Sequence, residues 1–234
     1  MSATIVRRRV IALAAILAST LLLVTIAIAN RPADAAANTT DLSGHSHGDV
    51  TPPRTPAQVA FHDQMRKLWE DHVTWTRLAI VTFADNSAGF QATATRLLQN
   101  QTDIGNAIKP FYGDAAGAHL TALLDDHINI AVELLVAAKA GDTGAFNDAS
   151  ARWYANANDI ADFLASANPR SWTQEQLRAS MKTHLDQTLA EAAHELGGDY
   201  AASVADYEAV HQHILAMADL LSSGIIRQFP SRFH

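Results

Sequence analysis

The sequence predicts an all-α protein: an antiparallel bundle of about six helices, built from repeated helical hairpins and preceded by a hydrophobic N-terminal segment. Alanine contributes much of the 48 % of residues that are hydrophobic, whereas the chain has only 11 glycines and 7 prolines. Alanine is the best helix former and glycine and proline are the worst, so the composition favours helices. From Gln58 onward, apolar residues also recur at the spacing of one helix face.

Short clusters of helix breakers divide this helical region. They fall at residues 86–89, 109–114, 141–144, 168–169 and 197–199, and each contains glycine or proline. Because these residues end helices for backbone reasons, they set the expected boundaries. The predicted helices cover roughly residues 58–85, 90–108, 115–140, 145–166, 172–196 and 199–227. Connections this short make sequential helices run antiparallel.

The first 35 residues have the layout of an export signal. Three arginines at positions 7–9 precede an uncharged apolar run over residues 10–29, and Ala33 and Ala35 then frame an A-x-A cleavage site. The run is also long enough to span a bilayer if it is not cleaved. Residues 1–35 are therefore predicted to be a signal peptide or a single transmembrane anchor. Both alternatives place the C-terminal domain outside the cytoplasm, secreted or anchored to the cytoplasmic membrane, because the arginines stay inside.

Two further segments follow this N-terminal region. Residues 36–58 contain three prolines among Thr, Asp, Ser and Gly, the composition of a flexible linker. Residues 59–230 are predicted to form a single helical bundle domain, since that length supports one sizeable core.

Charge and cysteine content limit the partners. The net charge is −7, and residues 1–35 carry +3 of it, so the remainder carries about −10. An acidic surface repels phosphate backbones, so nucleic acid is not an expected partner. The chain has no cysteine, which removes disulfides, thiolate ligands and a lipidated cysteine. The partners that remain are a membrane, through an uncleaved N-terminal segment, and an unidentified protein.

Two sequence blocks recur in the same order. Residues 71–75 match residues 126–130, and residues 96–104 match residues 152–160, at offsets of 55 and 56 residues. Two aligned blocks at nearly one offset predict a duplicated helical hairpin.

A third hairpin fits this repeat more loosely. His184 lies 57 residues after His127, and His213 falls near the position equivalent to Asp159 once a shorter glycine turn is allowed for. The sequence therefore predicts a duplication and is compatible with a triplication.

The predicted helices carry histidines on their apolar faces. His72 and His127 lie in the first and third helices, and His184 and His211 lie in the fifth and sixth. Helical spacing directs all four inward. His184 and His211 are also equidistant from the glycine pair at 197–198, so a hairpin turning there sets them at one level.

Buried imidazoles need partners, because an unpaired polar group in a core costs roughly 1–3 kcal/mol. Several converging imidazoles can meet this need by binding a metal, as in di-metal helical bundles. Zinc, copper, iron and nickel all accept imidazole. The sequence therefore favours a non-catalytic metal-binding bundle. Its candidate ligands are His72, His127, His184, His211 and His213.

Two alternatives remain open. The histidines can instead be core residues hydrogen-bonded to Asn100 and Asn156, which makes the protein a structural or interaction scaffold at the cell surface. A di-iron-like oxidoreductase needs carboxylates level with the histidines. Glu-x-x-His stretches at residues 191–194 and 208–211 have a suitable spacing but lie on consecutive helices. Whether the protein is an enzyme stays open, since no nucleophile elbow, phosphate loop or dinucleotide fingerprint is present.

Three blocks resemble a known family. They are LWEDHVTWTR at residues 68–77, RLLQNQTDIGNAIKPFY at residues 96–112 and GIIRQFP at residues 224–230. Over nearly all of residues 60–230 the chain is similar to a family of uncharacterised bacterial all-helical proteins. The resemblance implies that this region is one unit, and it implies no activity, because the family has no assigned function.

Overall fold

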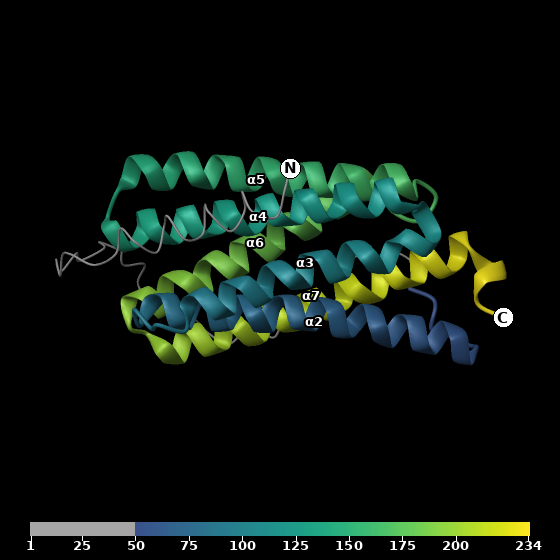
Figure 1. Cartoon of the computed structure of the whole chain (residues 1–234), viewed down its shortest axis with the longest axis horizontal. Coiled ribbons are helices and arrows are strands. Elements are labelled where there is room, and N and C mark those ends of the chain that lie inside the picture. The colour runs from purple at the N-terminus through teal and green to yellow at the C-terminus, as the bar shows by residue number, and fades with distance from the viewer. Residues whose placement is uncertain (1–49) are drawn as a thin grey trace, which may run out of the picture.

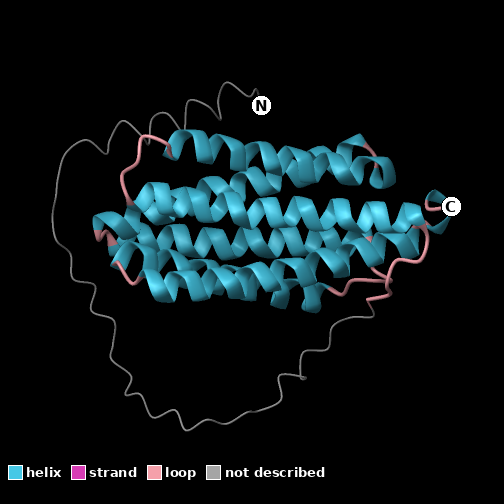
Figure 2. Ribbon diagram, turned by 90° about the horizontal axis from the view of Figure 1, so that it is seen from below, coloured by secondary structure: helices cyan, strands magenta, loops and turns pink. Residues whose placement is uncertain are grey.

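The computed structural model describes residues 50–234. In this part of the chain, six α-helices run along the long axis of the molecule (Figure 1). The loops that connect them lie at the two ends of the bundle (Figure 2). The helices are α2 (Pro56–Ala84), α3 (Phe90–Tyr112), α4 (Asp114–Ala140), α5 (Thr143–Ala167), α6 (Gln174–Gly197) and α7 (Tyr200–Gln228), followed by the 3-10 helix η1 (Pro230–Arg232). The predicted all-α bundle of six helices is confirmed.

The predicted signal peptide or membrane anchor at residues 1–35 lies outside the described residues, as does most of the linker predicted for residues 36–58. None of the helices from α2 to α7 is long and apolar enough to cross a membrane.

The six helices pack in a closed ring. Each helix contacts the next along the chain, and α7 returns to pack against α2. In Figure 1, α4 and α5 form the upper edge of the bundle and α2 and α7 the lower edge. The largest cluster of buried apolar side chains draws on all six helices, so residues 56–228 share one core. This arrangement turns one face of every helix toward a common interior, as the apolar stripes require.

The first helix begins earlier than the sequence analysis placed it. The Thr55 hydroxyl accepts a hydrogen bond from the Gln58 backbone N–H at 3.2 Å, and the Gln58 side-chain oxygen accepts one from the Thr55 N–H at 3.4 Å. This capping box, with Pro56 at the first helical position, fixes the start. Residues 56–58 of the predicted linker are therefore helical.

Residues preceding α2 contact the end of the chain. The Thr51 N–H donates to Ser223 Oγ at 3.0 Å, and the Thr55 hydroxyl donates to the Phe233 carbonyl at 2.9 Å. Figure 1 shows the C-terminus beside the start of α2. Thr51 and Thr55 of the predicted linker are therefore hydrogen-bonded to the C-terminal part of the helical domain.

The second helix ends later than predicted. Helix α3 continues through Pro110 to Tyr112 and ends at Gly113, whose φ of 86° interrupts the helix. Pro110 lies in the last turn, where its missing N–H removes one hydrogen bond at the helix end. The glycine, rather than the proline, sets this boundary.

Candidate functional site: a histidine-lined cavity

Three of the predicted histidines converge inside the bundle. His72 on α2, His127 on α4 and His184 on α6 are 3 %, 3 % and 4 % exposed. The ring centroids of His72 and His184 are 5.6 Å apart, and His127 is close enough to influence the charge of both. Each histidine lies on the first helix of its hairpin, so the three hairpins contribute one ring each.

An asparagine on α5 orients the ring of His127. Asn156 Nδ2 donates to the Leu123 carbonyl at 3.0 Å, which fixes the amide so that its oxygen faces His127 Nδ1 at 2.8 Å. We therefore assign the proton of the neutral ring to Nδ1, which leaves Nε2 with a free lone pair. The same ring stacks on Trp153, with centroids 5.1 Å apart.

A glutamine on α3 gives His72 the opposite tautomer, because it presents an N–H donor to the ring where Asn156 presents an oxygen acceptor. Gln101 Nε2 donates to the Leu97 carbonyl at 2.8 Å and lies 3.3 Å from His72 Nδ1. The amide therefore presents a donor to Nδ1, and we assign the proton of His72 to Nε2. The third ring is less restrained, because His184 Nδ1 is buried without a hydrogen-bond partner in the described region.

All three rings are neutral at physiological pH. Burial lowers the pKa of His72 to about 3 and the pKa of His127 to about 4. Burial and the neighbouring histidines also hold the pKa of His184 well below its usual value. Neutral imidazole is the form that binds a metal and accepts hydrogen bonds.

The structure places His211 differently from the sequence prediction. Its side chain is 25 % exposed and its Nε2 lies 3.0 Å from Glu70 Oε1, away from the three converging rings. The ring beside His184 is instead that of His213, stacked with centroids 6.5 Å apart. The prediction that His211 faces inward is wrong, because the buried stripe of α7 passes through Val210 and Ile214.

The three hairpins share one side-chain contact. In each, the second helix donates to a backbone carbonyl four residues before the interior histidine. The contacts are Asn100 Nδ2 to Leu68 O at 3.0 Å, Asn156 Nδ2 to Leu123 O at 3.0 Å and His213 Nε2 to Ser180 O at 3.0 Å. By this contact His213 is equivalent to Asn156 rather than to Asp159. The internal repeat stays a prediction, and this contact is what a tripled hairpin would produce.

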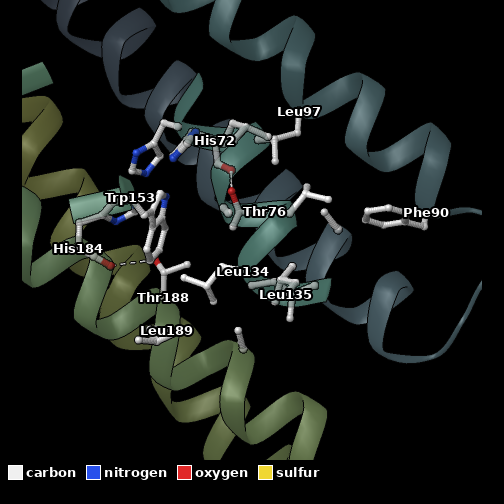
Figure 3. Close-up of a pocket in the computed structure, with 17 residues that line it drawn as sticks. His72, Thr76, Phe90, Leu97, Leu134, Leu135, Trp153, His184, Thr188 and Leu189 are labelled. Carbon is white, nitrogen blue, oxygen red and sulfur yellow. Dashed lines mark hydrogen bonds between the residues drawn. The ribbon is translucent and has the colours of Figure 1, made fainter. Parts of the chain in front are cut away.

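A cavity of about 50 Å³ adjoins the histidines. Figure 3 shows His72, Trp153 and His184 grouped at one end and Phe90 at the other. Most of the wall is aliphatic, with Ile80, Leu97, Ile128, Leu134, Leu135 and Leu189 among its side chains. Within residues 50–234, the lining contains no Asp, Glu, Lys or Arg.

The candidate metal ligands do not form a finished metal centre. Among the described residues, no group of three or more His, Asp or Glu side chains is arranged to hold an ion. The carboxylates that a di-iron-like oxidoreductase would need are also missing from the cavity wall, so the geometry gives that alternative no support.

A buried charged network, not predicted from the sequence, links α2, α6 and α7. Arg77 Nη1 lies 3.2 Å from Glu191 Oε1, and Arg77 Nη2 lies 3.1 Å from Glu195 Oε2. The hydroxyl of Ser203 accepts from Arg77 and donates to Glu195 at 2.6 Å. Glu191 and Glu195 are 1 % and 5 % exposed. Two glutamates four residues apart on the inward face of α6 are the sequence feature that could have indicated this network.

Replacing Glu191 with glutamine is expected to change how stability depends on pH. Burial raises the pKa of Glu191 to about 7 from 4.5, so the folded state binds this proton more tightly than the unfolded state. The resulting stabilisation is complete below about pH 4.5 and is lost as pH rises through about 7, on the order of 1–3 kcal/mol. Denaturant unfolding between about pH 5 and pH 8 measures this effect. As pH rises, the free energy of unfolding of Glu191→Gln should increase relative to that of the wild type. Parallel pH curves would contradict the raised pKa.

No protein-family model, curated protein or solved structure matches the chain. The fold and the site together define its class: a six-helix bundle in which three hairpins each direct one neutral histidine to a shared apolar cavity. The case for its function therefore depends on the geometry of that site.

Proposed function

We propose that the chain is an exported or membrane-tethered helical bundle that binds a transition metal ion through its interior histidines, without catalysis. The observation that carries this proposal is the convergence of three neutral imidazoles from three helices beside a cavity. Zinc, copper, iron and nickel are the candidate ions, because all accept imidazole and no thiolate is available. The export part of the proposal is supported by the N-terminal sequence pattern alone.

His127 is the ligand best prepared for a metal. Its Nδ1–H faces the Asn156 oxygen and its Nε2 lone pair is free, the arrangement common among metal-bound histidines. His72 is not yet prepared in this way, because its Nδ1 faces the amide nitrogen of Gln101. Metal binding through His72 Nε2 would therefore require the proton to move to Nδ1 and the Gln101 amide to turn. The rings must also move toward one another.

Elemental analysis after loading with each of the four metals tests this proposal. The wild type is expected to retain a stoichiometric amount, and His127→Ala should lose it. Asn156→Leu should weaken binding by about 10–100-fold, because it removes the group that orients His127. His211→Ala is the matched control and should bind like the wild type, since His211 pairs with Glu70 away from the cavity. No stoichiometric metal under aerobic and reducing loading, or an equal loss in the control, would contradict the proposal.

A structural role for the histidines is the second candidate. It is favoured by the amides of Gln101 and Asn156, which already occupy Nδ1 of His72 and His127. Under this scaffold hypothesis, each His→Ala change lowers the melting temperature by the same amount in chelator and in added metal. Under the metal-binding proposal, added metal raises the melting temperature of the wild type and leaves that of His127→Ala unchanged.

A further inference from the structure

The cavity beside the histidines extends into the bundle interior and is partly open toward the surface. Protein interiors contain few empty spaces larger than a water molecule. This space, at about 50 Å³, is roughly a third of the volume of an engineered cavity that holds benzene. It therefore has room for a molecule smaller than benzene.

The wall of the cavity discriminates by chemistry. Thr76 and Thr188 are among its few polar residues, and their hydroxyls donate to the carbonyls of His72 at 2.7 Å and of His184 at 2.8 Å. With their protons engaged, these hydroxyls face the cavity only as acceptors. Burying an ion against such a wall would be costly. A buried water needs two to four polar partners, which the aliphatic part of the wall does not provide. The part of an occupant that lies in the aliphatic portion of the cavity must therefore be uncharged and apolar.

The histidine end supplies several hydrogen-bonding atoms, among them one donor and one acceptor whose roles are fixed. Trp153 Nε1–H and His184 Nδ1, on residues of the same wall, also have no partner in the described region. His72 carries its proton on Nε2 and His127 has a lone pair on Nε2, as their amide partners determine. Among residues 50–234, neither Nε2 atom forms a hydrogen bond. A hydroxyl group matches both atoms, because it accepts from one nitrogen and donates to the other.

We propose that this cavity is a binding site for a small uncharged molecule with an aliphatic body and one hydroxyl group, of the class of short-chain alcohols. The aliphatic body lies against the leucine and isoleucine side chains of the wall. The hydroxyl donates to His127 Nε2 and accepts from His72 Nε2–H. This site needs no metal ion, so it does not rest on the proposed function.

Saturation-transfer NMR on the full-length chain in chelator, with 2-propanol and acetone as probes, tests the inference. The two probes have nearly the same shape, but acetone cannot donate a hydrogen bond. We expect 2-propanol to bind and acetone to bind up to about tenfold more weakly, the value of one net hydrogen bond. Equal binding of the two probes would overturn the assignment of the hydroxyl to His127.

Two substitutions that fill the cavity complete the experiment. Ala192→Leu on α6 and Ala131→Leu on α4 each place a larger side chain in the wall, and each should abolish the 2-propanol signal. Ala193→Leu is the matched control, because Ala193 is exposed on the same turn of α6 and should bind like the wild type. A 2-propanol signal that persists in Ala131→Leu, or that disappears in the control, would place the alcohol elsewhere and overturn the proposal.

Discussion

Replacing Arg77 with methionine is expected to lower the free energy of unfolding by about 3–5 kcal/mol, the usual effect of removing one partner from a buried ion pair. Arg77 is the only positively charged side chain within salt-bridge distance of Glu191 and Glu195 in the described region. Without it, Glu195 stays buried with no compensating charge, and Glu191 must take up a proton, because Arg77 is the group that lowers the pKa of Glu191. Denaturant unfolding at neutral pH measures the loss.

The loss should depend on pH and on the remaining carboxylates. Since burial raises the pKa of Glu191 to about 7, this group is mostly protonated in mildly acidic solution and Arg77→Met should then cost less. Adding Glu191→Gln and Glu195→Gln to the Arg77→Met variant should recover much of the stability, because a neutral network has no buried charge to solvate.

Arg152→Met is the matched control for this experiment. Arg152 also pairs with two carboxylates, Glu133 at 2.6 Å and Asp148 at 2.8 Å, but all three side chains are at least 44 % exposed. Solvent screens such pairs, so the expected loss is below about 1 kcal/mol. If the free energy of unfolding fell by less than about 1 kcal/mol in both arginine variants, the Arg77 network would not be a buried ion pair in solution.

The parts of the fold that depend on local sequence were predictable. Breaker clusters and apolar spacing identified all six helices, and they identified His72, His127 and His184 as inward residues. Each of these histidines lies in a continuous apolar stripe on its own helix. The position of such residues is set by the helix period alone.

The histidine of the last helix was not predictable in the same way. The helical spacing that would turn His211 inward would also turn Val204 inward, two turns earlier. Val204 is instead 52 % exposed, whereas Ser203 is fully buried. Ser203 is buried because it bonds to Arg77 and Glu195. Arg77 lies 126 residues away in the sequence, so no local pattern on α7 reveals that its inward face includes a serine.

The tautomers of the histidines and the cavity also required the assembled structure. Asn156 was recognised from the sequence as a partner for a histidine, but Gln101 was not. Gln101 reaches His72 across 29 residues and its orientation depends on the Leu97 carbonyl of its own helix. The cavity depends on how five helices leave space among their side chains, and that is a property of packing rather than of any one helix.

Gly105→Val is expected to destabilise the bundle by at least about 3 kcal/mol, toward the upper end of overpacking effects. A Cβ atom at Gly105 would lie 2.6 Å from the Gly117 carbonyl oxygen and 2.0 Å from Thr121 Oγ1. Thr121 can rotate away, but the backbone of α4 can be avoided only if the two helices separate. Thermal and denaturant unfolding both measure this loss.

The same substitution should disturb the histidine site. Gly105 lies one helical turn after Gln101, so moving α3 away from α4 shifts the amide that orients His72. We therefore expect Gly105→Val to change the NMR signals of His72 as well as the stability of the fold. Gly197→Ala is the control, because nothing lies within 4 Å of a Cβ there and the residue is helical. The free energy of unfolding of that variant should rise by up to about 1 kcal/mol, because its unfolded chain has lower conformational entropy. A Gly105→Val protein as stable as the wild type would show that α3 and α4 do not pack through this glycine contact.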